Sequence, residues 1–147
     1  MLARIVTVAT LIGLLGCASS APLPPGTAWT PSAWQAEDTI ALRSDCPEQG
    51  EYWFPVWLIV IDDQLYVRLG SKAAGRIQCT RAMPALGVRI AGHQFDRVHA
   101  TETPELAEKV SAAMAAKYWT DIFVRGVSHP LTLRLAPDGA GAPPTQR

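Results

Sequence analysis

The sequence lacks most of the features that identify a function directly. Its 147 residues include 13 basic and 13 acidic side chains, so the chain has no net charge, and no long run of one sign is present. Without a basic face, nucleic-acid binding is not expected. Only three residues are cysteines, and none stands in the Cys-x-x-Cys spacing of many metal and redox sites. No Gly-rich phosphate loop and no Gly-x-Ser-x-Gly elbow occurs, so the sequence identifies no catalytic residue.

An apolar run near the N-terminus is the first positive feature. Arg4 precedes residues 5–15, a run that is too short to span a hydrocarbon core of about 30 Å but has the length of a secretory h-region. The run ends in small residues directly before Cys17 and resembles the bacterial lipobox that lipoprotein signal peptidase cleaves. We therefore expect residues 1–16 to be a signal peptide and Cys17 to carry lipid. The alternative is a plain secretory signal, or a short anchor helix, with an incidental cysteine.

Lipid on Cys17 would hold the protein to a membrane of the cell envelope, because several acyl chains on one residue form a stable anchor. Ala18, rather than aspartate, after the lipidated cysteine favours the outer membrane, facing the periplasm, in a cell with two membranes.

Composition divides the rest of the chain. Residues 17–33 are rich in Ala, Ser, Pro and Gly and are expected to form a flexible tether. Residues 139–147 have the same character and are expected to be a disordered tail. One folded domain is therefore predicted over residues 34–138, a length that allows a single modest core.

Cys46 and Cys79 remain after lipidation. In an oxidising envelope compartment an even pair of cysteines is expected to form a disulfide. Closing a loop of that length would stabilise the fold by roughly 3–4 kcal/mol. Two buried free thiols are the alternative.

Alternating apolar residues predict strands in most of the domain. A first hairpin is expected, in which Asp62 and Asp63 form the turn and Pro55 marks a bulge or an edge position. A second hairpin is expected to turn at residues 91–93, and a short helix or turn to lie over 72–81. The predicted strands are residues 39–43, 52–61, 65–69, 86–90, 95–101 and 131–135.

The clearest helix is expected between the second hairpin and the last strand. Thr103 can cap it and Pro104 suits its first turn. An apolar stripe follows at every fourth residue: Leu106, Val110, Met114 and Tyr118. The predicted fold is mainly β (α+β), with about six mostly antiparallel strands and one covering helix in the C-terminal half.

Several stretches together resemble a known family. Residues 64–76 read QLYVRLGSKAAGR, Met83-Pro84 and VRIAG at 88–92 follow, and Lys117-Tyr118-Trp119 precedes TLRL at 132–135. This pattern resembles the split β-barrel of pyridoxamine-phosphate-oxidase-like and deazaflavin-dependent nitroreductase-like proteins over most of residues 52–137.

The resemblance implies a site for the phosphate of a flavin or deazaflavin after the first hairpin. Trp53 or Trp57 could then offer a flat face to the ring. The alternative is that these charged side chains are ordinary solvated residues. The residues that the resemblance assigns to phosphate binding are Arg68, Ser71, Lys72 and Arg76.

Two functions remain open from the sequence. One is an envelope lipoprotein that binds a small phosphate-bearing ligand, and the other is a non-catalytic structural or protein-interaction lipoprotein. A homodimer formed through the apolar strand at 52–61 and a tethered monomer are both compatible with the pattern. No metal site is expected, because His93, His99 and Glu102 are better interpreted as surface polar residues.

Overall fold

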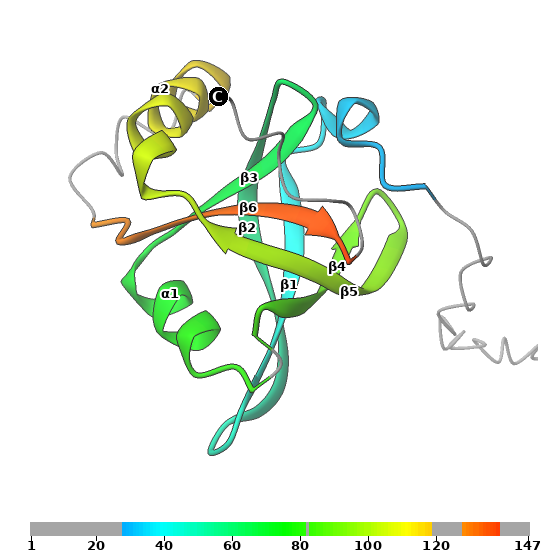
Figure 1. Cartoon of the computed structure of the whole chain (residues 1–147), viewed down its shortest axis with the longest axis vertical. Helices are drawn as coiled ribbons and strands as arrows, with labels where there is room; N and C mark the ends of the chain where they lie inside the picture. The colour runs from blue at the N-terminus through cyan, green and yellow to red at the C-terminus, as the bar shows by residue number, and fades with distance from the viewer. Residues whose placement is uncertain (1–27, 82, 119–127, 139–147) are drawn as a thin grey trace, which may run out of the picture.

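The computed structural model describes residues 28–81, 83–118 and 128–138, and they form a closed β-barrel (Figure 1). The strands follow the order β1-β2-β3-β6-β5-β4 around the barrel, and each neighbouring pair is antiparallel. The predicted antiparallel fold of six strands with a covering helix is confirmed. The strands are β1 (Thr39–Cys46), β2 (Gly50–Ile61), β3 (Gln64–Leu69), β4 (Ala85–Ile90), β5 (His93–Glu102) and β6 (Leu131–Pro137). The helices are η1 (Pro31–Trp34), α1 (Ser71–Gln78), η2 (Pro104–Leu106) and α2 (Ala107–Lys117).

Strand β2 divides its length between two neighbours. Its residues 50–57 pair with β1, and its residues 58–61 pair with β3. Pro55 lies opposite Ala41 in the part that pairs only with β1, which fits the predicted edge position. Asp62 and Asp63 both have positive φ angles, 51° and 55°, as a tight hairpin turn requires. The first predicted hairpin is therefore confirmed.

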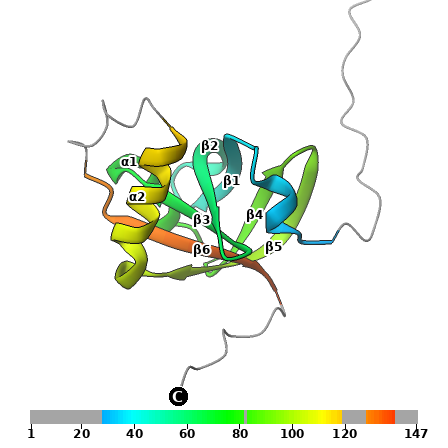
Figure 2. The same ribbon diagram turned by 90° about the horizontal axis from the view of Figure 1, so that it is seen from above.

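The barrel interior is filled by the apolar side chains that alternate along each strand. Leu42, Leu58, Val67, Val88 and Leu133 have no exposed surface. Ala74 and Ile77 of α1 pack against one end of this core, and Trp34 of η1 packs against it at the other (Figure 2). The apolar side of the strand at 52–61 is thus buried within one chain, and its pairing with a second copy stays a prediction.

The packed chain begins earlier than the sequence suggested. Trp29 contacts the core, and its ring lies 5.0 Å from Trp34 and 5.1 Å from Phe95 in edge-on contacts. The predicted boundary between tether and domain, at residue 34, is therefore several residues too late. Ala, Pro and Thr residues surround Trp29 in the sequence, so its neighbourhood resembles a linker.

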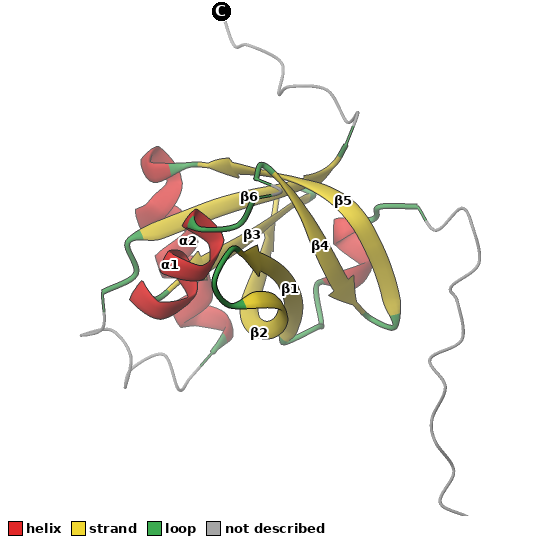
Figure 3. Cartoon of the chain, turned by 90° about the horizontal axis from the view of Figure 1, so that it is seen from below, coloured by secondary structure: helices red, strands yellow, loops and turns green. Residues whose placement is uncertain are grey.

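Helix α2 covers the outer face of β2 and β3 (Figure 3). The predicted stripe is buried there, since Val110, Met114 and Tyr118 pack on Ile59 and Tyr66. The expected cap is wrong: the Thr103 hydroxyl makes no cap and donates to the Thr132 carbonyl at 3.5 Å. The chain enters α2 through the short helix η2 instead.

None of the helices within the described ranges is long and apolar enough to cross a membrane. The predicted signal peptide, Cys17 and the predicted tail at 139–147 lie outside the described residues.

Candidate functional site

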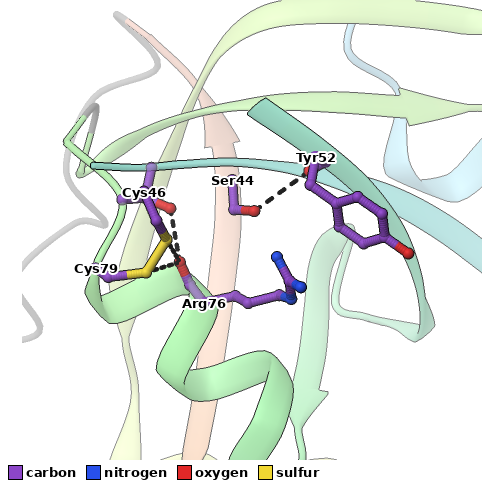
Figure 4. Close-up of a disulfide and its surroundings, with 6 residues drawn as sticks. Ser44, Cys46, Tyr52, Arg76 and Cys79 are labelled. Carbon is purple, nitrogen blue, oxygen red and sulfur yellow. Dashed lines mark hydrogen bonds between the residues drawn. A yellow bond between two sulfur atoms is a disulfide. The ribbon is translucent and has the colours of Figure 1, made fainter. Parts of the chain in front are cut away.

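The disulfide predicted between Cys46 and Cys79 is present, and it joins the end of β1 to the end of α1 (Figure 4). The two Cα atoms are 5.2 Å apart, within the usual range for a disulfide. A second link lies beside it, because the Arg81 amide donates to the Asp45 carbonyl at 3.1 Å. These links fix the position of α1, whose first residues belong to the predicted phosphate site.

Arg76 lies at the disulfide end of α1. Its guanidinium carbon is 4.5 Å from the centre of the Tyr52 ring, and its carbonyl oxygen is 3.2 Å from both cysteine sulfurs (Figure 4). The same carbonyl accepts a hydrogen bond of 2.7 Å from the Thr80 hydroxyl. The Arg76 side chain is therefore directed at Tyr52 of β2.

Arg68 lies on β3, where its neighbours come from a strand distant in sequence. It is paired with Thr132 of β6, and Tyr66, two residues earlier, is paired with Arg134. These four side chains share the outer face, because Val67 and Leu133 between them point into the core. The Nε atom of Arg134 is buried and has no hydrogen-bond partner in the described part of the chain. Sequence analysis missed Thr132 and Arg134, because alternation gives a residue's face but not its partner strand.

Helix α1 begins directly after β3, with Gly70 between the two elements. Gly70 is the N-cap residue, no side chain caps the helix, and its first turn contains no acidic residue. Ser71 and Lys72 are exposed there. A lysine beside the positive end of a helix dipole is unfavourable without an anion, and the first backbone N–H groups of a helix are available to bind one.

The chain that enters β6 runs beside the beginning of α1. The carbonyl of Ser128 would lie 3.9 Å from a Cβ atom placed on Gly70. Nδ1 of the next residue, His129, is buried and has no hydrogen-bond partner among the described residues. His129 is a further polar group that sequence analysis placed only in a loop.

The two tryptophans proposed as flat faces lie in different places. Trp57 directly precedes Leu58, the first β2 residue that pairs with β3, and Arg68 directly follows its partner Val67. Both residues therefore stand where β2 and β3 separate. The Trp57 ring stacks on Tyr118, with 4.8 Å between ring centres and 10° between planes. Trp53 contacts Arg89 instead, on the side of the barrel formed by β1 and β4.

The Trp57–Tyr118 stack is held by buried hydrogen bonds. The Tyr118 hydroxyl lies 2.6 Å from the Leu58 carbonyl and 2.8 Å from the Asp38 carbonyl, and burial raises its pKa to about 12. The adjacent Lys117 ammonium donates to the Glu37 carbonyl, and burial lowers its pKa from the ordinary value. The stack is thus a fixed aromatic surface, and the Lys117 ammonium lies 5.2 Å from the centre of the Tyr118 ring.

The Arg134 charge is one of the influences on the pKa of Tyr66. Burial raises the pKa of the Tyr66 hydroxyl, and the positive charge of Arg134 opposes that rise. Lys109 also opposes the rise, whereas the carboxylates of Asp62 and Glu105 add to it, so charges of both signs lie around Tyr66. Within the described ranges, no three His, Cys, Asp or Glu side chains are arranged to hold a metal ion.

Comparisons with known proteins connect this geometry to a fold. No protein-family model matches the sequence, and no curated protein matches it. Among solved structures, the chain is similar to HutZ, the haem storage protein from Vibrio cholerae, with a TM-score of 0.54 and 14% identity over 73% of this chain and 87% of HutZ. The fold is a split β-barrel. That part of the predicted resemblance is confirmed.

Two further structures are similar. One is a domain-swapped dimer, with a TM-score of 0.51 and 8% identity over 68% of this chain and 80% of the other. The second is an F420-H2 dependent reductase, with a TM-score of 0.48 and 11% identity over 68% of this chain and 94% of the reductase. At these identities, the likeness to HutZ and to the dimer is one of fold.

Proposed function

We propose that this protein is a lipid-anchored lipoprotein of the cell envelope whose split barrel binds a phosphate-bearing, flavin-like ligand. The ligand site consists of Trp57, Arg68, Ser71, Lys72, Thr132 and Arg134. One observation carries the proposal: Arg68 of β3 and Arg134 of β6 share an outer face, and β3 leads directly into the first turn of α1, which holds Ser71 and Lys72. Ion pairs within the described ranges involve Arg43, Arg97 and Lys109, but not Arg68, Lys72 or Arg134.

The chemistry of these residues fits a phosphate. Arginine forks bind phosphate oxygens through paired, charge-assisted hydrogen bonds. The buried Nε of Arg134 is an unused donor on this face. The first N–H groups of α1 and the Ser71 hydroxyl add neutral donors. A flavin-like ring could pack beside the Trp57–Tyr118 stack, and a flavin bound there would supply reversible electron transfer.

The proposed location rests on Cys17 and is supported by the disulfide. Structural disulfides persist in exported proteins and are rare in the cytosol. The outer membrane, facing the periplasm, is the proposed location in a cell with two membranes. Whether the protein also pairs with a second copy is a separate prediction, and similarity to a domain-swapped dimer is compatible with it.

Flavin mononucleotide and riboflavin form a matched pair of probes, because they differ only in the phosphate. We expect the detergent-solubilised mature protein to quench the fluorescence of flavin mononucleotide on titration and to bind riboflavin much more weakly. Arg68→Ala and Arg134→Ala should each weaken mononucleotide binding by roughly 1.5–3 kcal/mol, as for a charged hydrogen bond. Arg76→Ala and Arg81→Ala are matched controls and should leave the affinity unchanged.

Equal affinity for the two flavins would contradict the phosphate site. Binding of neither flavin would favour the non-catalytic interaction lipoprotein. Titration with haemin, monitored by its visible absorbance, is a third binding measurement. Haemin binding without flavin binding would replace the proposed ligand with a tetrapyrrole.

A further inference from the structure

A second group of polar and aromatic side chains lies on the outer surface of β1, β2, β4 and β5. Trp53 of β2 is paired with Arg43 of β1, and Arg43 is paired with Gly87 of β4. The neighbours Leu42, Phe54 and Val88 are buried, so Arg43 and Trp53 face outward. We call this group the Trp53 patch; it consists of Arg43, Glu51, Trp53, Arg89, Gln94 and Asp96. In the strand order, β1 and β4 lie across the barrel from β3 and β6, so the patch is separate from the ligand site.

The side chains of the patch hold one another in place. The guanidinium carbons of Arg89 and Arg43 lie 3.8 Å and 5.6 Å from the centre of the Trp53 ring. Arg89 Nε donates to Gln94 Oε1 at 2.8 Å, and Gln94 Nε2 donates to Asp96 Oδ1 at 2.9 Å. The Asp96 carboxylate lies 4.0 Å from Arg43 Nη1. Through Gln94 and Asp96, these contacts connect Arg89 to Arg43, and both arginines lie against the indole ring of Trp53.

The backbone is shaped around this arrangement. A Cβ atom at Gly87 would lie 2.7 Å from Arg43 Nε and 3.0 Å from its Cβ, so a larger residue would displace the arginine side chain from its present position. The pairing of β4 with β5 shifts register between Leu86 and Val88, next to that glycine. Such irregularities redirect side chains and occur often beside functional sites. Glycine inside a strand also weakens it, so its presence here needs a reason.

The stability of the fold does not explain the glycine at position 87. Arg89, Gln94 and Asp96 are exposed, and the ion pairs of Arg43 are 3.8 Å and 4.0 Å long. Exposed pairs of this kind contribute about 0–1 kcal/mol. Trp53 is half-buried beneath the two arginines and belongs to neither apolar core cluster. A glycine inside a strand and a half-exposed tryptophan outside the core are features that point to a binding surface.

The composition of the patch specifies its ligand. Two guanidiniums are matched by the carboxylates of Asp96 and Glu51, so an anion would meet repulsion as well as attraction. A neutral sugar suits this mixture, because each hydroxyl both donates and accepts hydrogen bonds, and the C–H face of the ring packs on aromatic surface. We propose that the Trp53 patch binds a neutral saccharide chain. The Trp53–Arg89 stack would carry the sugar ring, with Gln94 and Asp96 binding its hydroxyls.

Calorimetric titration of the full mature protein in detergent tests this, with hexasaccharides of N-acetylglucosamine and of glucose as probes. Trp53→Ala should weaken binding at least about tenfold through loss of the aromatic surface. Tyr52→Ala is the matched control, because Tyr52 is 49% exposed on the opposite face of the same strand. That variant should bind as the parent does. Raised salt should leave the affinity unchanged, since the ligand is neutral.

Gln94→Ala changes an exposed side chain and keeps the test decisive where Trp53→Ala fails to fold. It should weaken binding several-fold. Absence of binding to both sugars, or unchanged affinity in Gln94→Ala, overturns the proposal. Salt-sensitive binding of polyglutamate that is lost in Arg89→Gln and kept in Asp96→Asn also overturns it, and would identify a surface for acidic peptides.

Discussion

The hydroxyl of Tyr118 joins three parts of the chain at one point. It lies within hydrogen-bond distance of Leu58 on β2 and of Asp38 just before β1, while its ring stacks on Trp57. Tyr118 follows the last residue of α2, so these contacts attach the end of that helix to the barrel. The residue is therefore important both for stability and for the aromatic surface of the proposed ligand site.

Tyr118→Phe should lower the free energy of unfolding by about 1–1.5 kcal/mol at neutral pH, because the mutation removes the only proton that the side chain can donate to these carbonyls. Urea denaturation measures the change. Tyr52→Phe is the matched control and should have no effect, since Tyr52 is exposed and its hydroxyl has no hydrogen bond within the described part of the chain.

The contribution of Tyr118 to the free energy of unfolding changes with pH in a definite direction. Its pKa is about 12 in the folded protein against 10.0 for an ordinary tyrosine, so the unfolded chain loses this proton first. The stabilisation is therefore complete below pH 10 and is lost as the pH rises from there toward 12. Tyr118→Phe should flatten this alkaline loss, and an equal loss in the variant would contradict the assignment.

At the scale of elements, α1 is a short helix fixed mainly at its C-terminal end. The disulfide, the Arg81–Asp45 backbone bond and the Thr80 hydroxyl all lie there, whereas its first turn carries Ser71 and Lys72. An eight-residue helix has little stability alone. Its position therefore depends on these links and on the packing of Ala74 and Ile77.

Replacing Cys46 and Cys79 together by serine should destabilise the protein by roughly 3–4 kcal/mol, because the disulfide closes a long loop in the unfolded chain. Thermal unfolding of the variant, compared with the parent in oxidised and reduced form, measures this. The reduced parent should match the variant. A parent whose unfolding is insensitive to reductant would show that the bond contributes little.

Strand alternation predicted most of these elements correctly, because each strand has one buried face, as Leu65, Val67 and Leu69 show. The pairing of β3 with β6 and of β1 with β4 could not be predicted, since it joins segments distant in the chain. That pairing is what places Arg134 near Arg68 and Trp53 beside Arg89. The Thr103 cap failed for a similar reason: its hydroxyl bonds to Thr132 of another strand.

For the whole molecule, the proposal links a signal sequence, an anchor and one barrel domain. Cys17→Ala should leave the signal peptide uncut and abolish incorporation of labelled fatty acid, because only a thiol there can accept diacylglycerol. Metabolic labelling of expressing cells followed by membrane fractionation measures both effects. Cys79→Ser is the control and should keep its label. Full labelling of Cys17→Ala would rule out the lipobox.

The edge-on cluster of Trp29, Trp34 and Phe95 makes the N-terminal segment part of the barrel's end wall. This has a practical consequence for preparing an anchor-free form. A chain shortened to the boundary suggested by composition would lose Trp29 and expose the parts of Trp34 and Phe95 that it covers, which would favour aggregation. A water-soluble version should therefore start well before Trp29 and keep the whole cluster.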